Sequence, residues 1–160
     1  MSTPRMHQSP RRKPAHPTPI RHADRPTILM VTVTLSSRYS LLDNPAVHDA
    51  SRMSWTDATA WNVGYYMIMP DHYHLFCSPG NSCTVSVTAW CGYWKRSISK
   101  RVPSISGQWQ QDIWDLQIRT ALMYQQKLEY VMHNPVRAGL AADANDWPFQ
   151  GVMSDLQWTP

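Results

Sequence analysis

Apolar and polar residues follow two different periods in the middle of the chain. Residues 61–69 are mainly apolar without alternation, which is typical of a strand buried on both faces. In residues 72–77 a two-residue period places three side chains on one face, namely His72, His74 and Phe76. Only Pro70-Asp71 separates the two runs, so we expect them to form an antiparallel hairpin.

The same reading along the rest of the chain predicts further elements. They are a β-branched central strand over 28–35, a short helix near 46–53, an amphipathic helix over 87–98, a half-buried strand over 109–114, and a final helix from the N-cap Thr120 to about His133. The order β-α-β-β-α-β-α is the split βαβ, or ferredoxin-like, arrangement with one added helix. We therefore predict an α+β fold with an antiparallel sheet and a C-terminal helix.

The first 27 residues differ in composition from the remainder. They hold six prolines and six basic side chains against one acid, so their net charge is +5 and the rest of the chain sums to −1, since the total is +4. Such a segment buries too little apolar surface to offset the entropy of ordering. We predict a disordered basic arm over 1–27, followed by one domain over 28–160. Its cations, among them Arg11, Arg12 and Lys13, favour DNA contact over a merely solubilising role.

Hydropathy and cysteine content narrow the class of protein. No apolar run approaches the roughly 20 residues that span a bilayer, so a membrane protein is not expected. Three cysteines at no recognisable spacing indicate neither a disulfide framework nor a cysteine metal site. We expect a cytoplasmic, nucleoid-associated protein.

Basic and aromatic residues could contact nucleic acid. The predicted 87–98 helix has a basic side with Lys95 and Arg96, for which a solvated face is the common reading and phosphate contact the rarer one. Of eight tryptophans, most should lie in the core, while an exposed one could stack on unpaired bases.

Two positions suggest chemistry. His72 and His74 share a strand face, so their imidazoles can converge on one divalent metal ion, although most such pairs are ordinary polar surface residues. On the final helix Tyr130 lies nearly opposite the apolar stripe to which Tyr124 belongs, and Asn134 projects to almost the same side if the last turn holds.

These residues fall in motifs of a known family. Three motifs resemble, in the same order, those of the REP-associated tyrosine transposases of the single-tyrosine HUH nuclease superfamily. They are Met69-Pro70-Asp71-His72-Tyr73-His74-Leu75, then Tyr130 with Asn134-Pro135, and then Asp146-Trp147-Pro148. The resemblance implies a ferredoxin-like nuclease domain that cuts and rejoins single-stranded DNA at palindromic hairpins.

The resemblance also implies roles for individual residues. Tyr130 would be the nucleophile that forms a 5′-phosphotyrosine, and His72, His74 and Asn134 would bind Mg²⁺ or Mn²⁺. Apart from the resemblance, the basic residues Arg119 and Arg137 are further candidate DNA contacts. No nucleotide cofactor is needed, and we expect a monomer or homodimer.

Two departures from the family pattern and two rival functions remain open. Asp71 stands where the family usually has Asn, and its charge could tighten cation binding or hinder the approach of DNA; Tyr73 replaces a small aliphatic residue.

One rival function is that of a non-catalytic DNA-hairpin binding protein derived from such a transposase. The other is a metal hydrolase unrelated to DNA, for which only Asp71 offers a nearby carboxylate.

Overall fold

The computed structural model describes residues 16–22, 26–37 and 39–156. The candidate DNA contacts Arg11, Arg12 and Lys13 lie outside these residues.

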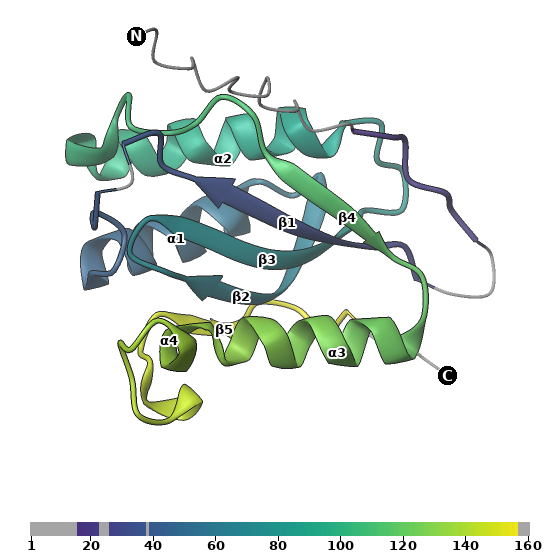
Figure 1. Ribbon diagram of the computed structural model, residues 1–160. Helices are drawn as coiled ribbons and strands as arrows, with labels where there is room; N and C mark the ends of the chain where they lie inside the picture. The colour runs from purple at the N-terminus through teal and green to yellow at the C-terminus, as the bar shows by residue number, and fades with distance from the viewer. Residues whose placement is uncertain (1–15, 23–25, 38, 157–160) are drawn as a thin grey trace, which may run out of the picture.

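A five-stranded antiparallel sheet forms the centre of the domain (Figure 1). Its strand order is β4-β1-β3-β2-β5. The strands are β1 (Ile28–Thr34), β2 (Trp61–Ile68), β3 (His72–Pro79), β4 (Trp114–Ile118) and β5 (Gln150–Val152). The β2–β3 hairpin and the ferredoxin-like order of the first four strands confirm the prediction.

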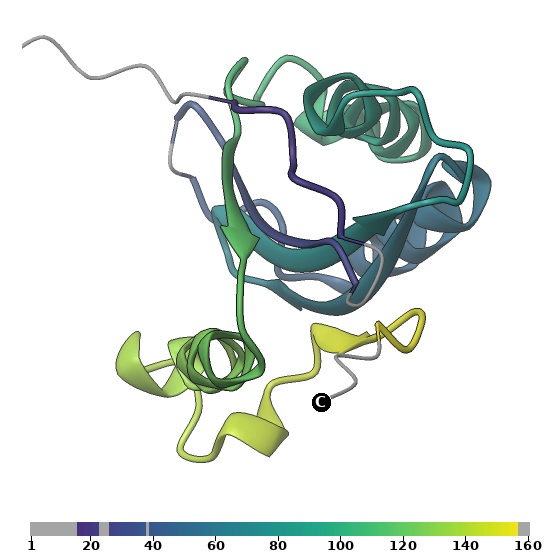
Figure 2. The ribbon, with the colours of Figure 1, turned by 90° about the vertical axis from the view of Figure 1, so that its right-hand side faces the viewer.

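Helices cover both faces of the sheet (Figure 2). Helices α1 (Pro45–Asp57) and α2 (Val87–Arg101) lie side by side on one face, over a core that contains Trp55, Trp90 and Trp94. Helix α3 (Ala121–Met132) lies on the other face and is followed by the single turn α4 (Asn134–Arg137). The face that carries His72 and His74 is therefore the α3 face, because Phe76 of the same strand face contacts Tyr124 of α3.

Side-chain caps fix where the three long helices begin. Asn44, Ser86 and Thr120 each accept a hydrogen bond from a backbone N–H three residues on, as N-caps do. Thr120 was the predicted cap of α3. Pro45 occupies the first turn of α1, where its missing N–H costs no hydrogen bond.

The predicted strand over 109–114 is wrong. Strand β4 begins at Trp114, where the predicted strand ends, and Leu116 pairs with Met30 of β1. Within 109–113 the backbone contacts described at this end of β1 are a hydrogen bond from Gln110 N to Thr34 O and an isolated bridge between Trp109 and Leu35, the residue after β1. Trp109, Gln110 and Gln111 line a cleft against α2 instead of pairing along β1.

The last long helix ends within one residue of the predicted end at His133. Helix α3 ends at Met132, and the chain starts a new turn at Asn134 with Pro135 in its first turn. Asn134 thus follows a break and lies at the start of α4. The short strand β5, which pairs with β2, was not predicted.

Part of the N-terminal arm lies against the domain. Ile20 and Gln117 of β4 exchange two hydrogen bonds, of 3.0 Å from Ile20 N and 2.7 Å to Ile20 O. The His16 ring contacts the Asp115 carboxylate, and Arg21 donates to Cys83 O. Residues 16–22 thus contact the domain, most of the rest of the predicted arm lies outside the described residues, and its disorder stays a prediction. Among the described residues no helix has the length and hydropathy needed to cross a bilayer.

Candidate active site

His72 and His74 lie side by side on β3. In the register with β1, His72 is opposite Thr34 and His74 is opposite Thr32. Their ring centroids are 4.8 Å apart and the rings are nearly perpendicular. The predicted shared face of the two imidazoles is therefore confirmed.

The His74 ring is fixed and neutral. Its Nδ1 lies 2.9 Å from Oγ1 of Thr32, which leaves Nε2 for other partners. Burial lowers the pKa of His74 to about 3, helped by the charges of His72 and Arg137. A neutral imidazole is the form that binds metals, so His74 has no proton to displace near neutral pH.

The His72 ring is held between Asp71 and Asn134. Asp71 Oδ1 lies 2.7 Å from Nδ1 of His72, and Asn134 Nδ2 lies 3.4 Å from its Nε2. With the Nδ1 proton donated to the carboxylate, Nε2 is the nitrogen with a lone pair. Asp71, whose role the sequence left open, therefore orients a histidine in the way that carboxylates orient metal-binding imidazoles.

The donor set of His72, His74 and Asn134 fits a divalent cation. Partners at both Nδ1 atoms leave the two Nε2 atoms as ligands, and a half-turn of the Asn134 amide presents its oxygen at the same place. In the described part of the chain no three His, Cys, Asp or Glu side chains form a metal cluster, so the third donor has to be an amide or an external oxygen.

Tyr130 is exposed at the end of α3. Its relative exposure is 59%, whereas the next residue, Val131, is fully buried. Tyr124, one of the predicted stripe residues, packs against Phe76 with ring centroids 5.1 Å apart, and burial raises the pKa of its phenol. The predicted position of Tyr130 off the apolar stripe is confirmed.

Arg137 of α4 covers the ring of Tyr130, a contact that the sequence analysis missed. The guanidinium carbon is 3.8 Å from the ring centroid, and Nη2 donates to the Tyr130 backbone oxygen at 2.5 Å. The charge of Arg137 also lowers the pKa of His74, so the side chain lies near both parts of the site. Arg137 follows Tyr130 by seven positions, and the break at Asn134 lies between them.

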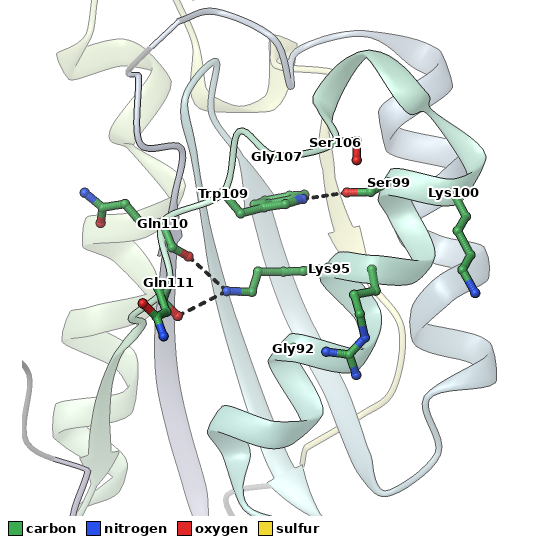
Figure 3. Close-up of a pocket in the computed structure, with 10 residues that line it drawn as sticks. Gly92, Lys95, Ser99, Lys100, Ser106, Gly107, Trp109, Gln110 and Gln111 are labelled. Carbon is green, nitrogen blue, oxygen red and sulfur yellow. Dashed lines mark hydrogen bonds between the residues drawn. The ribbon is translucent and has the colours of Figure 1, made fainter.

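The basic residues proposed as DNA contacts occupy different surroundings. Lys95 is buried, not on the outer side of α2 as predicted, and its ammonium donates to Gln110 O at 3.0 Å and to Gln111 O at 3.5 Å (Figure 3). Burial lowers the pKa of Lys95, and the Arg96 charge adds to this effect. Arg119 is exposed just before α3. Whether these side chains contact DNA stays a prediction.

One described tryptophan is largely exposed. Trp114 is 51% exposed, while Trp55, Trp61, Trp90, Trp94 and Trp147 are buried. Trp114 is opposite Thr32 in the β1–β4 register, and Thr32 is opposite His74 in the β1–β3 register. Directly opposed residues share a face, so Trp114, Thr32 and His74 form one row across the α3 face.

Comparisons of the sequence with known proteins find relatives named for one family. A REP-associated tyrosine transposase of Escherichia coli is 25% identical over 125 residues, which cover 76% of this chain and 69% of that protein. A Haemophilus influenzae protein named for the same family is 27% identical over 104 residues, 56% of this chain; the match spans only 58% of that relative's length.

A solved structure extends the comparison to the fold. The REP-associated tyrosine transposase bound to a REP hairpin is 20% identical, with a TM-score of 0.67 over 82% of this chain and 79% of that chain. No family model matches the chain. The resemblance predicted from the motifs is nevertheless confirmed: in sequence this chain resembles the REP-associated tyrosine transposases, and it has their fold.

Proposed function

We propose that this chain is a metal-dependent single-stranded DNA endonuclease and strand transferase that acts on hairpin-forming, palindromic DNA. The observation that carries the proposal is that the α3–α4 break has a candidate nucleophile on one side and a candidate metal ligand on the other. An exposed phenol, Tyr130, precedes the break, and Asn134 after it lies 3.4 Å from His72. The relatives' name as transposases and the hairpin bound in the similar structure support DNA as the substrate.

The proposed reaction balances without a nucleotide cofactor. The Tyr130 oxygen attacks the phosphorus of a phosphodiester, forms a 5′-phosphotyrosine and breaks the bond to the 3′ oxygen. The phenol loses a proton and the departing 3′ oxygen gains one. Attack by the 3′-hydroxyl of another strand reverses these steps, joins the strands and releases Tyr130.

Residues around the nucleophile position the reacting groups. Arg137 holds the Tyr130 ring, and its positive charge opposes the negative charge that develops at the phosphate and the phenol oxygen. Asp71 and Thr32 fix the two imidazoles through their Nδ1 atoms. A Mg²⁺ or Mn²⁺ ion bound by His72, His74 and Asn134 would polarise the scissile phosphate.

Exposed Trp114 fits a single-stranded substrate. It lies two strands from His74 on the same face, so its indole can stack on an unpaired base beside the scissile phosphate.

A covalent adduct on a denaturing gel tests the proposal. Full-length protein is incubated with labelled single strands that contain a hairpin, together with Mg²⁺ or Mn²⁺. We expect an adduct in the parent protein and in Tyr124→Phe, and none in Tyr130→Phe. Hairpin binding without adduct in the parent protein would instead identify a non-catalytic hairpin-binding protein.

A further inference from the structure

A second candidate site lies on the other face of the sheet, away from the His72–His74 pair. A cleft of about 540 Å³ separates α2 from the segment 106–111 (Figure 3). Its lining includes three cations, Lys95, Arg96 and Lys100, and no acid. The rest of the lining is hydroxyl, amide and glycine residues together with Trp109. This composition favours an anionic ligand that also has hydrogen-bonding groups.

Lys95 forms the buried base of the cleft. Its ammonium has three N–H donors, of which the Gln110 and Gln111 carbonyls take two. The weaker of these bonds is 3.5 Å long. At least one N–H donor of the buried Lys95 ammonium is therefore available to a ligand. The attraction between a buried charge and an anion is stronger than that between an exposed charge and an anion.

Arg96 has room to fold along the wall of the cleft. A Cβ atom at Gly92, one turn earlier in α2, would lie 3.3 Å from Nη1 of Arg96. Glycine at this position thus lets the guanidinium lie close to the helix. Arg101 on the same helix differs, because its guanidinium is paired with Asp57 at 3.0 Å.

The cleft and the candidate active site lie at the same end of the sheet. Gln110 N donates to Thr34 O, and Thr34 is opposite His72. Two strand spacings of nearly 5 Å separate the backbone of the cleft wall from that of His72, about 10 Å in total. Because the two sites lie on opposite faces of the sheet, a strand that contacts both passes around this end of the sheet, and its path is longer than this backbone distance.

We propose that this cleft binds the sugar-phosphate backbone of the unpaired strand that flanks the hairpin. Arg96 and Lys100 contact phosphate oxygens at the entrance, and Lys95 donates to the phosphate that enters deepest. A volume in the range of small-ligand pockets suits one or two nucleotides of a single strand. The choice of DNA rests on the function proposed above.

Fluorescence anisotropy with two DNA probes tests the proposal. One probe is a hairpin with single-stranded flanks, and the other is the same hairpin without flanks. Combined Arg96→Ala and Lys100→Ala substitution should weaken binding of the flanked probe on the order of tenfold. It should also flatten the slope of log affinity against log salt by about 1.4, which is two contacts of about 0.7 each. Arg101→Ala is the matched control and should change affinity less than about twofold.

Phosphates in the flank are then neutralised one at a time as methylphosphonates. Neutralising a contacted phosphate should weaken binding by the parent protein. It should not weaken binding by the Arg96→Ala, Lys100→Ala protein further, because the interaction is already absent there. The proposal would be overturned if the Arg96→Ala, Lys100→Ala protein lost as much affinity for the probe without flanks as for the flanked probe. It would also be overturned if this protein bound the flanked probe as tightly as Arg101→Ala does. The Tyr130 adduct is scored separately, in the parent protein at saturating DNA. Its absence in the parent protein would contradict the proposed reaction and leave the affinity comparison to decide on the cleft.

Discussion

Arg137 stacks on Tyr130 and at the same time hydrogen-bonds its backbone oxygen. The guanidinium carbon is 3.8 Å from the ring centroid, and the Nη2 to oxygen distance is 2.5 Å. The side chain thus joins α4 to the end of α3 across the break that Asn134 and Pro135 create. Because Asn134 also contacts His72, the break adjoins the histidine pair as well as Tyr130.

We predict that Arg137→Ala slows formation of the Tyr130 adduct more than it weakens DNA binding. Loss of the stacked cation frees the ring and removes a charge that opposes the developing negative charge. The single-turnover rate at saturating DNA should fall on the order of a hundredfold, by analogy with the removal of one electrostatic donor from an active site.

Arg137→Lys separates positioning from charge. Lysine keeps the charge but lacks the planar group that stacks and bonds to the Tyr130 oxygen at once. We expect only partial recovery of the rate. A rate in Arg137→Ala equal to that of the parent, with a higher dissociation constant for DNA, would mean that Arg137 acts only as a phosphate contact.

We predict that Asp71→Asn weakens metal binding. A carboxylate that accepts a hydrogen bond from Nδ1 of His72 makes Nε2 of the same ring a stronger metal ligand than a neutral amide at residue 71 would. Affinity for Mn²⁺, measured by calorimetry without DNA, should fall by about tenfold, and Asp71→Ala should lose more. Asp112→Asn, an exposed acid outside the site, is the control. Unchanged affinity in both Asp71 variants would show that the His72–Asp71 contact does not support a metal site.

The sequence predicted the parts of the site that depend on a regular period. A two-residue period places His72 and His74 on one face of any strand, and a helical period places Tyr130 nearly opposite the apolar stripe that contains Tyr124. Lys95 could also have been located, because it follows the buried Cys91 by four residues and so adjoins the apolar stripe of α2.

The contacts that the sequence did not predict depend on irregular backbone. Arg137 contacts Tyr130 across a point where the helix ends and restarts within two residues, and the geometry of such a break cannot be read from a helical period. The strand predicted over 109–114 had the right alternation, but a tertiary contact prevailed: the Gln110 and Gln111 carbonyls bind Lys95 of α2. Alternation alone does not distinguish these partners.

We predict that protonation of His48 destabilises the fold. Arg52 Nη1 donates to the Tyr66 hydroxyl at 2.6 Å, so this hydroxyl is free to donate to Nε2 of His48, 2.8 Å away. Burial lowers the pKa of His48 below 6.5, the Arg52 charge lowers it further, and Asp49 opposes the shift. The unfolded state therefore binds the proton more readily, so the stability contributed by neutral His48 is present above pH 6.5 and is lost as the pH falls through the lowered pKa.

Thermal unfolding at pH 8 and pH 5.5 checks this prediction. The melting temperature of the parent protein should fall more between these values than that of His48→Gln, which has no proton to take up at this position. His74 is present in both proteins, so its own titration cancels in the difference. Equal falls would show that His48 makes no contribution to the pH dependence.

The last prediction concerns Trp114, which is 51% exposed in the row that contains Thr32 and His74. Stacking of one base on an aromatic ring contributes about 1–3 kcal/mol, so Trp114→Ala should weaken binding of a flanked hairpin by roughly 5- to 150-fold, while Trp114→Phe should retain part of the affinity. Leu116→Ala is the matched control, because Leu116 is also exposed on the same face of β4 but has no ring. An abasic site at the stacked nucleotide should remove the difference between the parent and Trp114→Ala. If Trp114→Ala and Leu116→Ala weaken binding equally, the contact is general apolar burial and no base stacks on the indole.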